Sequence, residues 1–143
     1  MNREEELRED SLIHQELLER IRRLCLSFPG TSERLSHGAP TFFINEKKSF
    51  VQHHTNHHGD GKIAIWFAAP SGLQSMLVES DPEIYFAPAY VAHLGWVGMR
   101  LDRNAEWEEI AGVIGDAYLA RAPKKYREIL MNTFRVVLQR NDN

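Results

Sequence analysis

Six consecutive residues, Ile63-Ala64-Ile65-Trp66-Phe67-Ala68, are all apolar, and this run indicates the architecture of the chain. A strand with one face in water alternates apolar and polar residues, whereas a strand covered on both faces does not. We therefore expect 63–68 to be a central strand whose hydrogen-bonding ladder is fully paired. Immediately before it stands His53-His54-Thr55-Asn56-His57-His58-Gly59-Asp60-Gly61-Lys62, a polar loop that holds four of the seven histidines.

Strand-forming segments lie on both sides of this run. Residues 41–44 and 49–53 are separated by the turn sequence Asn45-Glu46-Lys47-Lys48, which is the pattern of a β-hairpin. Farther along, 85–91 is extended, and Pro88 within it favours an edge strand or a bulge. Residues 96–101 alternate, as a strand with one buried face does. The sequence therefore predicts a sheet built around 63–68.

Residues with helical periodicity precede, interrupt and follow the predicted strands. Apolar residues recur at steps of three or four from Ile13 to Phe28, with Ser11 as the expected N-cap and Pro29-Gly30 as the end. Ser71 and Gln74 have capping-box spacing before a short helix. Asn104 is expected to cap a further helix. Pro123 suits the first position of the last helix, whose apolar residues are expected to face the core or a partner chain: Tyr126, Ile129, Leu130, Phe134, Val137 and Leu138.

These elements predict an α+β fold with an antiparallel β-sheet and helices packed on one side. The expected order is α-β-β-β-α-β-β-α plus an extra C-terminal helix. The 143 residues contain no repeat and no linker. We therefore expect a single domain over 1–143, with a core of about 11–122 and a C-terminal helical extension over 123–140.

Composition restricts the protein class. The hydrophobic fraction is 43% and the charged fraction 26%, typical of a globular domain. The lone Cys25 is expected to be a structural thiol in a reducing compartment. No apolar stretch approaches a membrane span, and the first ten residues are acidic, unlike a signal peptide. We therefore expect a cytoplasmic protein that does not contact membranes. The net charge of −3 argues against avid DNA binding.

Several short motifs, taken in order, resemble the MmcQ/YjbR-like family. They are Pro29-Gly30 after the first helix, His37-Gly38-Ala39-Pro40-Thr41-Phe42, Pro88-Ala89-Tyr90 and Gly95-Trp96-Val97. The loop His57-His58-Gly59-Asp60-Gly61-Lys62 is similar to a stretch found in one branch of that family. The resemblance runs from about the first helix to Ala122. It implies an α+β fold and a DNA-binding role through a double-wing arrangement of hairpins, and no established enzymatic activity.

The histidine-rich loop allows three interpretations. Imidazoles bind metals, but adjacent histidines on a strand point to opposite faces, and the spacing of four residues typical of a helical site is absent. Asp60 could supply an oxygen ligand to a metal, but a closed structural site normally has four ligands in fixed geometry. Gly59 and Gly61 would let backbone amides turn toward an anion, with donors from His57, His58 and Lys62. Alternatively, the imidazoles bond to nearby backbone. We predict no metal and no cofactor, and we take His57, His58, Asp60 and Lys62 as candidates for a small anionic ligand, a phosphate or a carboxylate.

A nucleic-acid interface would use basic residues at hairpin tips and strand ends. The candidates are Lys47, Lys48, Lys62, Arg100 and Arg103. The alternative is that tip lysines keep a sheet edge soluble. No G-x-S-x-G elbow or oriented acid accompanies the serines and histidines, so a binding module is expected rather than an enzyme. The predicted partners are DNA or a small anionic ligand, and the chain is expected to be a monomer or a homodimer.

Overall fold

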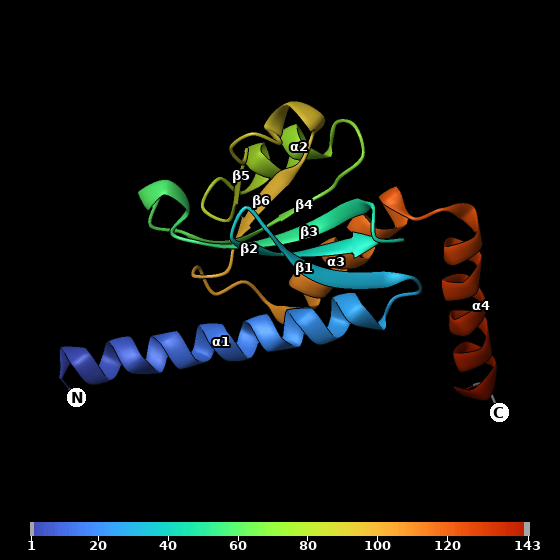
Figure 1. Ribbon diagram of the computed structural model, residues 1–143, viewed down its shortest axis with the longest axis horizontal. Coiled ribbons are helices and arrows are strands. Elements are labelled where there is room, and N and C mark those ends of the chain that lie inside the picture. The colour runs from blue at the N-terminus through green and yellow to red at the C-terminus, as the bar shows by residue number, and fades with distance from the viewer. Residues whose placement is uncertain (1, 142–143) are drawn as a thin grey trace.

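The computed structural model describes residues 2–141 as one antiparallel sheet with helices around it (Figure 1). The helices are α1 (Arg3–Ser27), α2 (Leu73–Ser80), α3 (Trp107–Arg121) and α4 (Lys124–Asn141), with single-turn 3₁₀ helices η1 (His57–Gly59) and η2 (Ala92–Leu94). The strands are β1 (Thr31–Ser36), β2 (Ala39–Ile44), β3 (Lys48–Thr55), β4 (Ile63–Phe67), β5 (Tyr85–Phe86) and β6 (Val97–Arg100). The predicted α+β class is confirmed.

The strands follow the order β1-β2-β3-β4-β6-β5, and every neighbouring pair is antiparallel. The apolar run is β4, which pairs with β3 on one side and β6 on the other. Its residues Ala64 to Phe67 are all buried. A central strand covered on both faces has no position for a polar side chain, and this explains the lack of alternation in its sequence.

The pairing register assigns side chains to the two faces of the sheet. His53 pairs with Ile65, and Ile65 with Met99, so these three share one face. Gln52 pairs with Trp66 and His54 with Ala64, and these point to the opposite face. The two adjacent histidines of β3 are therefore directed to opposite sides of the sheet.

The core lies between the His53 face and the helices α1 and α3. Ile21 and Cys25 of α1 meet Ile114 and Tyr118 of α3, and all four side chains are fully buried. Tyr118 stacks on Phe28 at 4.7 Å between ring centroids and donates a hydrogen bond to the Pro29 carbonyl at 2.7 Å. Burial raises the pKa of the Cys25 thiol, as expected of a structural cysteine. Helix α2 lies near β5, on the side of the molecule away from α1 (Figure 1).

Strand β1 is absent from the expected order. Its sequence Thr-Ser-Glu-Arg-Leu-Ser has no buried residue, because β1 is an edge strand that pairs with β2 alone. Main-chain pairing with β2, over the register Thr31↔Ile44 to Ser36↔Ala39, holds it in place. A strand stabilised in this way leaves no periodic apolar signal in the sequence.

The three expected caps are wrong. Helix α1 begins eight residues earlier than Ser11, at Arg3, because Asn2 Oδ1 accepts a hydrogen bond from the Glu5 amide at 2.9 Å. Gly72 caps α2 without a side-chain bond, and Gln74 instead donates to the carbonyls of Ala92 and Trp96 at 2.9 and 2.6 Å. Asn104 has a left-handed φ of 59°, and α3 starts after Glu106. Only for Gln74 does a contact distant in sequence replace the expected cap; at α1 another local cap, Asn2, takes precedence over Ser11.

Gly98 of β6 provides a test of the packing. A Cβ atom at this position would lie 2.3 Å from the tip of the Phe86 ring on the neighbouring β5. We expect Gly98→Ala to displace that ring and to lower the free energy of unfolding by about 1–2 kcal/mol. The control is Gly112→Ala in α3, where a Cβ meets no atom within 4 Å. There we expect a gain of about 0.5–1 kcal/mol from helix propensity. Urea titrations measure both, and equal effects at the two sites would contradict the packing argument.

His53 should make stability depend on pH. Its side chain is 6% exposed, and its Nε2 atom has no hydrogen-bond partner in the described part of the chain. Burial, assisted by the charge of Arg22 and by His14, lowers the pKa of His53 to about 4. The unfolded chain protonates a histidine near pH 6.5, so the stability due to neutral His53 is complete above that pH and is lost as the pH falls toward 4.

The expected loss from this one group is about 2 kcal/mol between pH 7 and pH 5. Urea unfolding of the wild type and of His53→Leu over this interval measures it. The variant should be close to wild type at pH 7, since an apolar side chain of similar size leaves no unpaired polar atom, and relatively more stable at pH 5. Parallel stability curves for the two proteins would show that His53 is not the titrating group.

Candidate functional site

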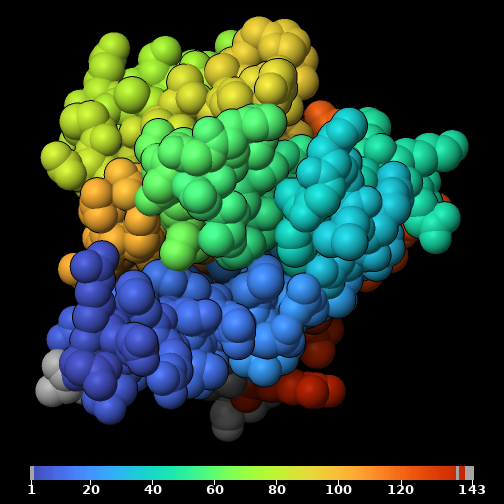
Figure 2. All heavy atoms as spheres, turned by 60° about the vertical axis from the view of Figure 1, so that its left-hand side comes forward, coloured from blue at the N-terminus to red at the C-terminus, as the bar shows by residue number. Residues whose placement is uncertain are grey.

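A pocket of about 680 Å³ lies on the sheet face opposite the α1–α3 core, beside the histidine-rich loop. In Figure 2 the loop (green) occupies the surface between the β1–β2 hairpin (cyan) and the segment that follows β5 (gold). The pocket therefore combines three segments that are distant in sequence. Its lining consists of Ser36, His37, Gln52, His54, His57, His58, Trp66, Tyr90 and Val91.

The loop between β3 and β4 is held by its own polar groups. The Asn56 amide donates to the Lys62 carbonyl at 2.7 Å, and Asn56 Oδ1 accepts from the Gly61 amide at 2.8 Å. Asp60 Oδ1 accepts from the Lys62 amide at 2.9 Å. Asn56 and His58 both have left-handed φ angles, 51° and 48°. Strained backbone of this kind persists where surrounding contacts over-determine it, and here it presents His57 and His58 to the pocket.

Aromatic rings form the wall of the pocket. His54 stacks on Trp66 with 3.7 Å between centroids and an interplanar angle of 28°. The His57 ring lies across both, 5.0 Å from His54 and 4.8 Å from Trp66. His58 lies 4.1 Å from His57, and Tyr90 lies 6.0 Å from His57 and 6.1 Å from His58. Three of the four loop histidines therefore converge on one pocket, together with two aromatic residues from β4 and the segment after β5.

His54 is a neutral imidazole in this setting. Burial lowers the pKa of His54 to about 4, and the neighbouring imidazoles of His57 and His53 lower it further than Asp60 raises it. Its Nε2 atom lies 3.0 Å from Gln52 Oε1. The tautomer with hydrogen on Nε2 donates to that oxygen, and its Nδ1 atom then remains an acceptor. His54 can therefore orient a ligand by a hydrogen bond without carrying charge near neutral pH.

Two polar groups near the pocket make few bonds. Trp66 is 3% exposed, and its Nε1–H has no hydrogen-bond partner in residues 2–141. Tyr90 Oη lies 3.4 Å from His58 Nε2, which is a long contact, and the Tyr90 side chain is 71% exposed. Burying a donor without a partner costs about 1–3 kcal/mol. Native structures contain few such groups, so the unpaired Trp66 donor calls for an explanation.

The four ligand candidates separate into two pairs. His57 and His58 line the pocket, whereas Asp60 and Lys62 do not. The carboxylate of Asp60 is engaged by the backbone of its own turn. The ammonium of Lys62 lies 4.2 Å from the centre of the Phe86 ring, a cation–π contact with a residue that does not line the pocket. The structure thus brings together the two imidazoles but not the lysine and the aspartate.

The candidate list lacks seven residues that line the pocket: Ser36, His37, Gln52, His54, Trp66, Tyr90 and Val91. Strand alternation carries a signal for two of them, because Gln52 and His54 are two residues apart on β3 and must share a face. Tyr90 takes a left-handed φ of 66°, which aims it from an irregular segment, and no local pattern predicts this. Ser36 is the last residue of β1, and His37 follows it. Because β1 has no apolar periodicity, the sequence does not predict the position of either residue.

The nucleic-acid candidates do not form one surface. Lys47 and Lys48 lie at the β2–β3 turn, at the opposite end of β3 from Lys62 (Figure 1). The length of that eight-residue strand puts the two groups roughly 25 Å apart. Arg100 forms two hydrogen bonds with Asp102, at 3.0 and 2.9 Å, and these raise the pKa of Arg100. Arg103 is exposed and bonds to the Asp102 carbonyl.

Within residues 2–141, no three His, Cys, Asp or Glu side chains are grouped so that they would hold a metal ion. Over the same residues, no helix combines the length and the apolar character needed to cross a bilayer.

Comparison with known proteins identifies the family. A family model described as YjbR matches residues 26–120. The crystal structure of Deinococcus radiodurans protein DR2400, with the family-model domain DUF419, has a TM-score of 0.64 and 14% identity, and the match covers 79% of this chain and 86% of that chain. At this identity the likeness is one of fold. No curated protein matches significantly. The family model covers well over half of the sequence, so this chain belongs to the YjbR family, as the sequence motifs predict.

Proposed function

We propose that the pocket beside the histidine-rich loop binds a small molecule with a flat ring and an anionic group such as a carboxylate or a phosphate. The observation that carries this proposal is the convergence of His54, His57 and His58 with Trp66 and Tyr90 on one 680 Å³ pocket. Ligand pockets of proteins have volumes of about 300–1,000 Å³ and combine aromatic walls with a few placed polar groups.

The ring preference follows from the wall of the pocket. The stacked pair of His54 and Trp66 is flat, and His57 stands nearly perpendicular to it at 70–83°. Tyr90 is held 6.0 Å from His57 and is exposed on its other side. A planar ligand can stack on an aromatic side chain here and meet the edge of another, the two arrangements that aromatic quadrupoles favour.

The anion preference follows from the polar groups. The imidazoles of His57 and His58, the Tyr90 hydroxyl and the Ser36 hydroxyl all supply donors to the pocket. Among the described lining residues there is no Asp or Glu, so a bound anion meets no direct carboxylate repulsion. The carboxylate of Asp60 is directed to its own backbone. This arrangement supports an anion better than it supports a cation.

Binding rather than catalysis is the function proposed. Ser36 and the histidines share the pocket, yet no hydrogen bond joins a serine to a histidine within residues 2–141. A nucleophile needs a base in contact and a third group that orients the base. His54 is oriented by Gln52, a neutral amide, so a developing imidazolium would lack the carboxylate that stabilises it in a triad.

Three simple probes separate the two preferences: phenyl phosphate, inorganic phosphate and phenol. We expect phenyl phosphate to bind best, because it satisfies both the ring wall and the donors, and calorimetric titration measures the three affinities. The variant His57→Ala/His58→Ala should bind phenyl phosphate at least about tenfold more weakly, which corresponds to one lost charge-assisted hydrogen bond.

The matched control is His93→Ala, because His93 is an exposed histidine on η2 that does not line the pocket. It should retain wild-type affinity. Equal weakening in both variants, or an absence of binding by all three probes at millimolar concentration, would exclude this ligand class.

DNA is the alternative ligand, implied by the family resemblance and by the exposed lysines at the β2–β3 tip. We expect only weak retention of duplex DNA, lost between 50 and 200 mM salt, because two tip lysines release few counterions. Lys47→Glu/Lys48→Glu should abolish this retention, and His57→Ala/His58→Ala should leave it unchanged. Mobility-shift assays over a salt series measure both. Tight, sequence-selective retention that survives 200 mM salt would instead make DNA the principal ligand.

A further inference from the structure

We propose that the protein forms a homodimer in which α4 of one copy packs along α1 in a second copy, from the acidic first turns of α1 to the groove at residues 12–23. These two helical segments expose apolar side chains and carry opposite charge. The start of α1 and the end of α4 lie on opposite sides of the molecule (Figure 1). Neither segment can therefore cover the other within one copy.

Helix α4 is anchored at its start and uncovered beyond it. Tyr126 packs against Gly30, whose position has room for a hydrogen but not for a Cβ, since that atom would lie 2.5 Å from the tyrosine ring. Tyr126 and Leu130 contact the core cluster. The same side of the helix continues through exposed apolar residues at helical spacing. They are Ile129, Phe134 and Val137, with exposed fractions of 49%, 57% and 48%.

An exposed stripe on a regular helix needs a partner, because amphipathic helices gain most of their stability from packing of the apolar face. Met131 and Val136, on the flanks, are also about half exposed, at 50% and 47%. Five large apolar side chains along one helix would bury on the order of 400–500 Å². Two symmetric copies of such a contact, counting both surfaces, exceed the roughly 1,200 Å² of a stable protein interface.

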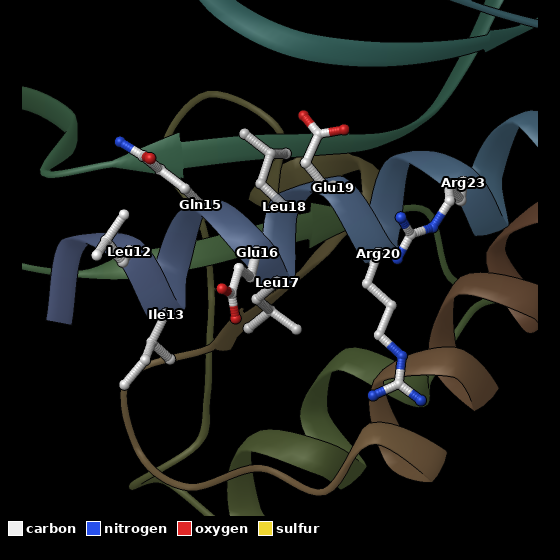
Figure 3. Close-up of a pocket in the computed structure, with 9 residues that line it drawn as sticks. All are labelled: Leu12, Ile13, Gln15, Glu16, Leu17, Leu18, Glu19, Arg20 and Arg23. Carbon is white, nitrogen blue, oxygen red and sulfur yellow. The ribbon is translucent and has the colours of Figure 1, made fainter. Parts of the chain in front are cut away.

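The complementary surface is on α1. A groove of about 890 Å³ runs along this helix, lined by Leu12, Ile13 and Leu17 with charged residues around them. Figure 3 shows Ile13, Glu16, Leu17 and Arg20 directed to one side of the helix. Leu12 and Ile13 are 57% and 58% exposed. Together with Leu17, one turn after Ile13, they are the apolar side chains of this groove that α4 of a second copy would contact.

The charges of the two helices favour contact between α4 and α1 over contact between two copies of the same helix. From residue 3 to residue 13, α1 carries five acidic side chains and two arginines. Helix α4 carries five basic side chains and one glutamate. Two copies of α4 would repel each other, as would two copies of the α1 segment, whereas α4 against α1 brings opposite charges together. A twofold axis then makes the α1–α4 contact twice, which closes the assembly as a dimer.

The test is the oligomeric state by sedimentation velocity over a concentration series. We expect a wild-type dimer. Phe134→Glu should shift it to monomer, because the change places a charge in the centre of the apolar stripe. The matched control is Leu35→Glu, which alters an equally large apolar residue, 71% exposed, on the edge strand β1. This control should remain dimeric, and circular dichroism checks that each variant is folded.

Charge reversal identifies the partner surface. Glu9→Lys/Glu16→Lys on α1 should weaken the dimer at least tenfold, as should Arg127→Glu/Arg135→Glu on α4. A chain carrying all four reversals restores opposite charges and should recover dimerisation. Loss without recovery would overturn the α1–α4 pairing. A monomeric wild type at 100 µM would overturn the proposal as a whole, and a monomer that co-sediments with anionic vesicles would assign α4 to a lipid surface instead.

Discussion

The pairing of β3 with β4 is the constraint on which the rest of the molecule depends. Its register places Ile65 and Phe67 on the helix side and Ala64 and Trp66 on the pocket side. A slip of one residue would exchange the two sets, and the apolar character of β4 alone would not prevent it. The partner strand supplies the distinction, because β3 alternates Val51 and His53 with Gln52 and His54. The pocket and the core are therefore determined by the same pairing.

The sequence predicts those parts of the fold that leave a periodic signal. The central strand, the hairpin from 41 to 53 and the apolar stripes of the helices all follow from alternation or helical spacing. Strand β1 does not, because an edge strand held by main-chain bonds to β2 needs no apolar face. The predicted helix caps are wrong because residue type alone does not determine the backbone conformation of a residue. Asn104 suits a cap by residue type, but its left-handed backbone belongs to the turn before α3.

The sequence predicts where the candidate site lies, but not which residues line it. The density of histidines marks the loop, and the period of two along β3 separates His53 from His54. The role of Lys62 depends on Phe86, which is 24 residues away in sequence and reaches the loop through the β5–β6 pairing. Tyr90 reaches the pocket through an irregular segment tied to Gln74 by way of Ala92. Such contacts depend on tertiary packing, so residue type and spacing cannot reveal them.

The two imidazoles of β3, buried His53 and half-buried His54, both have a pKa lowered by desolvation to about 4, but they differ in their contacts. His53 loses its solvation under α1, with Arg22 nearby, and its Nε2 makes no compensating bond. His54 is also desolvated, yet it bonds to Gln52 and stacks on Trp66 at the wall of an open pocket. Desolvation at His53 makes the stability of the fold fall as the pH is lowered from 6.5 toward 4. Desolvation at His54 keeps the imidazole neutral, and its contacts with Gln52 and Trp66 hold it in a fixed orientation beside the His57 ring.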